Sequence, residues 1–91
     1  MNIVIHKRIK KRHPDISNTE ILEALENTLN WIQRSKHNGE IFGIGITKQG
    51  RFLEYVYMEY KEAILVYHAQ LATKNAFKEL GLADRRRNED R

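Results

Sequence analysis

Four side chains in the second half of the chain could together cleave RNA: Arg51, Tyr67, His68 and Lys74. An imidazole can move the proton of a ribose 2′-hydroxyl near neutral pH. Cations can stabilise the pentacovalent phosphate that forms next, and an aromatic ring can stack on a base. These residue types indicate an endoribonuclease. The alternative is structural, with Tyr67 as a core residue whose hydroxyl is hydrated and His68 as a hydrogen-bonding residue at a strand end.

Two predicted strands must bring these residues together. A long strand covers 51–60, and the last strand covers 63–68. A tight turn at Lys61–Glu62 joins them in antiparallel order, so Arg51 is expected roughly opposite residues 70–72. The candidate residues would then meet at one edge of the sheet, where the final helix begins.

The net charge of +4 resides in one short segment. Residues 1–15 contain a single acid, Asp15, and five basic side chains: Lys7, Arg8, Lys10, Lys11 and Arg12. No acid lies between these basic residues to form ion pairs across successive helical turns. The segment therefore predicts a docking surface for a nucleic acid or an acidic protein, and a solvated helix face is the alternative.

Several chemistries lack the residues that they need. The chain has no cysteine, which excludes disulfides, thiolate zinc sites and cysteine nucleophiles. No metal-binding spacing is found among its four histidines, which are His6, His13, His37 and His68. Its glycines match no phosphate-binding loop, and Gly43 and Gly45 indicate tight strand packing instead. We therefore expect no cofactor and no metal ion.

The composition is that of a globular domain, with 41% apolar and 31% charged residues. No apolar run approaches the ~20 residues of a membrane span. At the N-terminus the charged residues follow the apolar ones, which is the wrong order for a secretory signal. We expect a cytoplasmic protein that does not enter the membrane.

Local signals predict eight elements. Pro14 ends a first helix, Ser17 and Glu20 form a capping box for a second, and Gly81 stops the last. In chain order, the elements are a short strand over 2–5, helices over 6–13 and 18–30, strands over 31–34, 41–46, 51–60 and 63–68, and a helix over 74–80.

This order predicts an α+β fold with N-terminal helices, an antiparallel sheet of three to four strands, and a C-terminal helix, in two layers. A single domain is expected over residues 1–82. Residues 83–91 are polar, with almost no apolar surface to bury, and are expected to form a disordered tail.

Two stretches resemble the BrnT-type proteins of the RelE-like toxin superfamily. KRHPDISNTEILEAL, at 11–25, resembles the family's opening into an acidic amphipathic helix. GRFLEYVYMEYKEAILVYHAQLAT, at 50–73, resembles its strand, hairpin and closing strand. The order of elements agrees over roughly residues 6–80. The ending is also similar to a set of small proteins without an established activity, through Tyr67-His68-Ala69, Thr73-Lys74 and Glu79-Leu80-Gly81.

The resemblance implies a ribonuclease that cleaves RNA without a metal ion, and a small antitoxin protein that blocks it. It matches His13 to the family's helix-opening histidine and Arg51 to its first strand arginine. The closing strand departs from the family, because Tyr67-His68-Ala69 stands where an arginine is usual. Lys74 and Lys78 stand near the place of a glutamate–arginine pair in the last helix.

The leading hypothesis is a toxin-like RNA endonuclease in which 2′-hydroxyl attack gives a cyclic phosphate. His68 or His13 would act as general base or acid, and Tyr67 would orient the base or phosphate. Arg51 and Lys74 would stabilise the phosphorane, and the basic segment would dock the RNA. A second hypothesis is a non-catalytic module that binds nucleic acid or an acidic protein through the same basic segment. A third is a structural subunit that forms a homodimer through an unpaired edge of the long strand.

Overall fold

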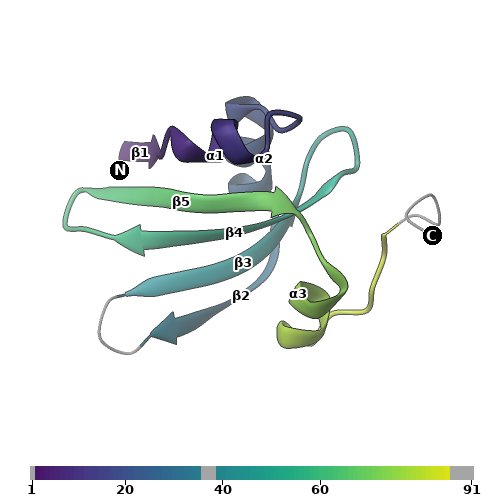
Figure 1. Cartoon of the computed structure of the whole chain (residues 1–91). Helices are drawn as coiled ribbons and strands as arrows, with labels where there is room; N and C mark the ends of the chain where they lie inside the picture. The colour runs from purple at the N-terminus through teal and green to yellow at the C-terminus, as the bar shows by residue number, and fades with distance from the viewer. Residues whose placement is uncertain (1, 36–38, 87–91) are drawn as a thin grey trace.

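The structure is a computed structural model that describes residues 2–35 and 39–86, so His37 and most of the predicted tail lie outside the described residues. Five strands and three short helices make up the described chain (Figure 1). Their order is β1 (Asn2–Ile5), α1 (Arg8–Arg12), α2 (Asn18–Glu26), β2 (Thr28–Ser35), β3 (Glu40–Ile46), β4 (Phe52–Glu59), β5 (Ala63–Leu71) and α3 (Lys74–Glu79).

The strands form one mixed sheet in the order β1-β5-β4-β3-β2. Strands β2 to β5 follow one another as antiparallel neighbours, whereas β1 pairs in parallel with β5. The predicted antiparallel sheet of three to four strands is therefore wrong. The hydrophobic pattern predicted a strand at residues 2–5, but a pattern within one segment carries no information about a partner some sixty positions away.

Helices cover both faces of the sheet, so the two-layer prediction is also wrong. α1 and α2 bury Ile9 and Ile21 against one face, where they pack near Leu53 of β4. α3 buries Phe77 against the opposite face, near Val56 of the same strand. Figure 1 shows α1 and α2 together on one side of the sheet and α3 on the other. Because successive side chains of a strand point to opposite faces, β4 contributes to both cores.

The local signals place most element boundaries correctly. Ser17 and Glu20 form the predicted capping box, Thr73 caps α3, and Gly81 has a φ of +67° just after that helix. α2 ends at Glu26, earlier than the prediction. The hydroxyl of Thr28 donates to the carbonyl of Leu25 at 2.9 Å, and this contact satisfies the end of the helix where the chain turns into β2.

Strand β4 occupies the middle of the sheet. The amide of Ala72 donates to the carbonyl of Phe52 at 2.8 Å, which is the register expected for residues 51–52. However, β4 pairs with β3 on one side and β5 on the other, so it has no free edge for a second chain. The expected unpaired edge of the strand 51–60, through which a homodimer was predicted, is therefore wrong, because β1 and β2 form the edges of the sheet. In the part of the chain that the structure describes, no helix is both long enough and apolar enough to cross a membrane.

Candidate active site

Two histidines meet at the edge of β5 that β1 leaves uncovered. β1 pairs with β5 only as far as Val66, and α1 then runs beside the rest of the strand. The Nε of Arg8 donates to the carbonyl of Tyr67 at 3.1 Å and holds the helix there. This packing brings the ring of His13, directly after α1, to 6.5 Å from the ring of His68, in an edge-to-face arrangement.

A buried carboxylate orients His68. Glu54, on β4, is only 6% exposed, and its Oε2 lies 3.0 Å from Nε2 of His68. Its Oε1 accepts from both the backbone amide and the hydroxyl of Thr73, each at 3.0 Å. Burial raises the pKa of Glu54, but the hydrogen bonds from His68 and Thr73 together outweigh it and leave the pKa below its usual value.

The charge on Glu54 determines the tautomer of its neighbour. An ionised carboxylate can only accept hydrogen bonds, so Nε2 of His68 must carry the proton that it donates to Glu54. In the neutral ring, Nδ1 is then an acceptor. Nδ1 has no hydrogen-bond partner within the described ranges, and the His68 side chain is 33% exposed. The pair Glu54–His68 therefore presents a basic nitrogen beside His13.

An irregularity in β5 places Tyr67 next to His68. Val56 pairs with His68 whereas Tyr57 pairs with Val66, so Tyr67 is an extra residue without a partner in β4. Such β-bulges redirect side chains and often lie beside active sites. Tyr67 packs with the α3-side core, its hydroxyl donates to Glu40 Oε2, and the guanidinium of Arg8 lies 5.5 Å from the centre of its ring.

Arg51 and Lys74 do not join the histidines. Nε of Arg51 lies 3.2 Å from Glu20 Oε2 without hydrogen-bond geometry, and Nη2 lies 3.6 Å from Asp15 Oδ2. These ion pairs hold Arg51 against the segment between α1 and α2. Lys74 begins α3 and is exposed, and among the described residues it makes no hydrogen bond or ion pair. In the described part of the chain, no hydrogen bond or ion pair therefore links Arg51 or Lys74 to Tyr67 or His68.

The basic helix α1 buries its apolar residue and exposes its cations. Ile9 is buried, while Lys10, Lys11 and Arg12 are exposed and form no ion pair with any described residue. His13 follows Arg12 directly in the chain. The exposed cations therefore lead up to the histidine pair, and only Arg8 is engaged with β5.

Two members of the cluster, Glu54 and Thr73, were not among the residues predicted for the site. Glu54 occurs in a strand pattern between Phe52 and Val56, which predicts that all three share one face. A carboxylate on a face that is otherwise apolar indicates a buried polar partner. Thr73 caps α3 through its contact with the amide of Ala76, in addition to its contacts with Glu54.

No family model, curated protein or solved structure matches the chain. Within residues 2–35 and 39–86, no group of three or more His, Cys, Asp or Glu side chains could hold a metal ion. The function must therefore be argued from the site itself.

Proposed function

We propose that this protein is a toxin-like, metal-independent RNA endonuclease that cleaves by attack of the ribose 2′-hydroxyl. The observation that carries the proposal is the pair His13–His68, with ring centres 6.5 Å apart and one ring held by buried Glu54. Cleavage of this kind needs one group to take a proton and another to give one. Two imidazoles on either side of a phosphate are suited to both tasks.

In the first step, Nδ1 of His68 accepts the proton of the 2′-hydroxyl as its oxygen attacks the adjacent phosphorus. Protonated His13 then gives its proton to the 5′-oxygen as the P–O5′ bond breaks. The products are a 2′,3′-cyclic phosphate and a free 5′-hydroxyl, and the two histidines have exchanged protonation states. Glu54 stabilises the imidazolium that forms on His68, as a buried carboxylate does for other histidine bases.

The cations of α1 would position the substrate. Lys10, Lys11 and Arg12 are free to contact phosphates on the way to His13, and such contacts do not depend on base identity. Arg8, already beside Tyr67, hydrogen-bonds to the backbone of the strand that carries His68. It takes the phosphate-stabilising role in this proposal in place of Arg51 and Lys74.

The resemblance to the BrnT-type proteins extends the proposal to the cellular compartment of the enzyme and to its protein partner. It supports a cytoplasmic toxin whose RNA cleavage is blocked by a small antitoxin protein. The absence of cysteine fits a reducing compartment. A small DNA-binding protein encoded in the neighbouring reading frame would support this part of the proposal.

The proposal is tested by RNA cleavage with analysis of the product ends. The wild-type protein should produce 2′,3′-cyclic phosphate ends in the presence of a chelator, both on purified RNA and in a translating extract. His68→Ala should lower the rate by about 100-fold or more, since general acid–base catalysis contributes 10²–10⁴. His6→Ala is the matched control, because among the described residues the His6 side chain hydrogen-bonds only with the amide of Arg8, and the backbone hydrogen bonds of His6 are kept in the variant. Equal rates for the wild type and His68→Ala would overturn the proposal.

The second candidate is a non-catalytic module that docks a nucleic acid or an acidic protein. The exposed cations Lys10, Lys11 and Arg12 favour it, because they form a complete docking surface without His68. This function predicts binding that weakens steeply with salt and no cleavage product. Charge reversal at Lys10 and Lys11 should abolish binding, whereas His68→Ala should leave it unchanged.

A further inference from the structure

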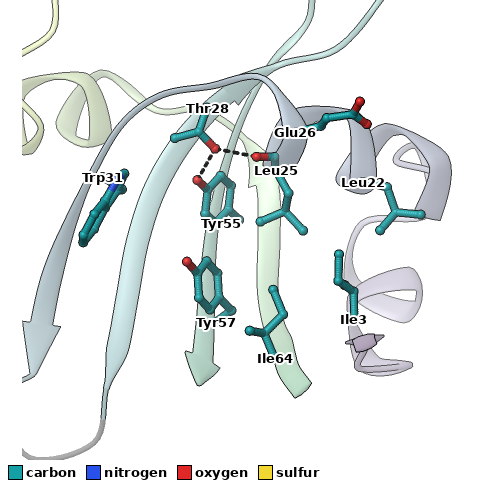
Figure 2. Close-up of a pocket in the computed structure, with 9 residues that line it drawn as sticks. All are labelled: Ile3, Leu22, Leu25, Glu26, Thr28, Trp31, Tyr55, Tyr57 and Ile64. Atoms are coloured by element: carbon teal, nitrogen blue, oxygen red, sulfur yellow. Dashed lines mark hydrogen bonds between the residues drawn. The ribbon is translucent and has the colours of Figure 1, made fainter. Parts of the chain in front are cut away.

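The face of the sheet opposite His68 contains a pocket of about 600 Å³. It lies between α2, β1 and the strands β2, β4 and β5, as Figure 2 shows. Its lining is mostly apolar or aromatic and includes Ile3, Leu22, Leu25, Trp31, Tyr55 and Tyr57. The volume falls in the range of ligand-binding pockets, about 300–1,000 Å³. None of the residues to which we assign catalysis lines it.

A glycine makes room for one of the aromatic rings that line this pocket. Gly43, on β3, pairs with Trp31 on one side and Tyr55 on the other. A Cβ at Gly43 would collide with the Tyr55 hydroxyl, so the Tyr55 ring extends over a position that has no side chain. The Tyr55 ring stacks on Tyr57 at 5.9 Å, and its hydroxyl shares a hydrogen bond with Thr28. These contacts fix the aromatic wall before any ligand arrives.

The rim of the pocket exposes large apolar side chains. Trp31 is 56% exposed, Leu22 is 41% exposed, and Ile3 is exposed to a similar degree. Tryptophan is enriched among the residues that contribute most to protein–protein binding, where one ring buries a large area at a small entropic cost. A broad opening edged by such residues fits a segment of another protein.

The charges around the pocket indicate the character of its partner. Glu26 is the only charged residue in the lining, and it has no ion pair among the residues that the structure describes. α2 as a whole carries three glutamates and no basic residue. The Tyr57 hydroxyl also has no hydrogen-bond partner within the described ranges. The pocket itself therefore disfavours a polyanion and favours a partner with lysine or arginine beside its apolar residues.

From these observations we infer that the pocket binds an amphipathic helical segment of a partner protein. Apolar side chains of the segment would enter between Leu22, Trp31 and Tyr57, and a lysine or arginine would pair with Glu26. The basic helix of a second copy of this chain is a poor occupant, because its apolar residue Ile9 is already buried. The inference does not depend on the proposed nuclease activity.

The test uses the fluorescence of Trp31, the only tryptophan in the chain. The probe is a synthetic amphipathic peptide of about four helical turns, without tryptophan, with leucines on one face and lysines on the other. Saturable binding with a blue shift of Trp31 emission is expected, since the ring leaves water. A peptide with glutamates in place of the lysines should bind at least about tenfold more weakly.

Two matched leucine variants establish where the peptide binds. Leu22→Ser should weaken binding at least about tenfold, which is ~1.4 kcal/mol of lost apolar contact. Leu71→Ser, at a residue 46% exposed but outside the pocket lining, should leave binding unchanged. Glu26→Gln should weaken binding of the lysine peptide and reduce its salt dependence.

Three results would overturn the inference. One is the absence of a saturable shift with the lysine peptide, and another is equal binding of the glutamate peptide. The third is a blue shift of Trp31 with rising protein concentration alone, accompanied by a doubled mass, because it would show that a second copy fills the pocket.

Discussion

The two faces of the sheet use the same strands for different purposes. On the α3 side, β4 and β5 contribute Glu54, Tyr67 and His68. The Glu54 carboxylate and Nε2 of His68 are hydrogen-bonded. On the α2 side, β4 contributes Tyr55 and Tyr57 to an apolar pocket. The α3 face carries a polar cluster held by the Glu54–His68 contact, and the opposite face carries an aromatic surface beside an acidic helix.

The comparison shows how a small domain separates two kinds of chemistry. Glu54 and Tyr55 are neighbours in the chain, yet the alternation of a strand sends them to opposite faces. The bulge at Tyr67 interrupts that alternation and places two consecutive polar aromatic residues on the same side. Substitutions at adjacent positions should therefore affect one face and spare the other.

The largest expected effect on stability is on the α2 side, at Gly45. A Cβ there would collide with the backbone carbonyl of Ala24, so Gly45→Ala must push α2 away from the sheet. We expect a loss of about 3 kcal/mol in the free energy of unfolding, measured by urea titration. Gly43→Ala should cost less, about 1 kcal/mol, because its collision is with the end of the Tyr55 side chain. An equal loss of unfolding free energy in both variants would contradict the conclusion that α2 packs directly against Gly45.

On the α3 side, the expected effect depends on pH. The pKa of Glu54 is lower in the fold than its ordinary value of 4.5, so the ionised carboxylate stabilises the protein above pH 4.5. That contribution is lost as the pH falls through the lower folded-state pKa. Glu54→Gln should destabilise the protein by about 1.5 kcal/mol at neutral pH.

The same substitution should flatten the acid limb of the stability curve. Urea titrations at a series of pH values give this curve, and wild type and Glu54→Gln should converge as the solution becomes more acidic. A constant difference at every pH would show that the carboxylate charge has no part in holding His68. The Trp31 fluorescence response to peptide should be the same in both proteins.

The smallest effect on stability is expected at Arg51, which contacts neither the Glu54–His68 cluster nor the pocket on the α2 side. Arg51→Ala removes an ion pair with exposed Asp15 and a contact in which Arg51 Nε and Glu20 Oε2 are both buried, and together these losses should cost about 1 kcal/mol in the free energy of unfolding. RNA cleavage by the folded variant should be unchanged. A loss of cleavage comparable to that of His68→Ala would restore Arg51 to the site and contradict the arrangement described for the α3 side.

Local features of the sequence were sufficient to predict the helices and strands, but not how these elements pack together. The capping residues, Gly81 and the alternation of β4 predicted boundaries and faces, because each reports on its immediate neighbours in the chain. The parallel pairing of β1 and the side of the sheet taken by α3 depend on contacts between distant residues. Neither leaves a periodic signal in one segment.

The candidate site was predictable only in part for the same reason. His68, Tyr67 and His13 were chosen for their chemistry, and the structure places them near one another. Arg51 was placed beside them from a correct register, but the register fixes the backbone and not the partner of a long side chain. Its guanidinium pairs with acids that the sequence analysis had assigned to other elements. Whether these residues catalyse remains a prediction.

The most direct test of the central claim is the pH dependence of RNA cleavage in a chelator, measured under single-turnover conditions. If His68 and His13 act as base and acid, the wild-type profile should be bell-shaped. His68→Ala should lose one limb and His13→Ala the other, while His6→Ala should keep both. The two losses should not be additive, because both groups act in one step. If both variants kept the shape of the wild-type pH profile, whatever their absolute cleavage rates, the assignment of His68 and His13 as base and acid would be contradicted.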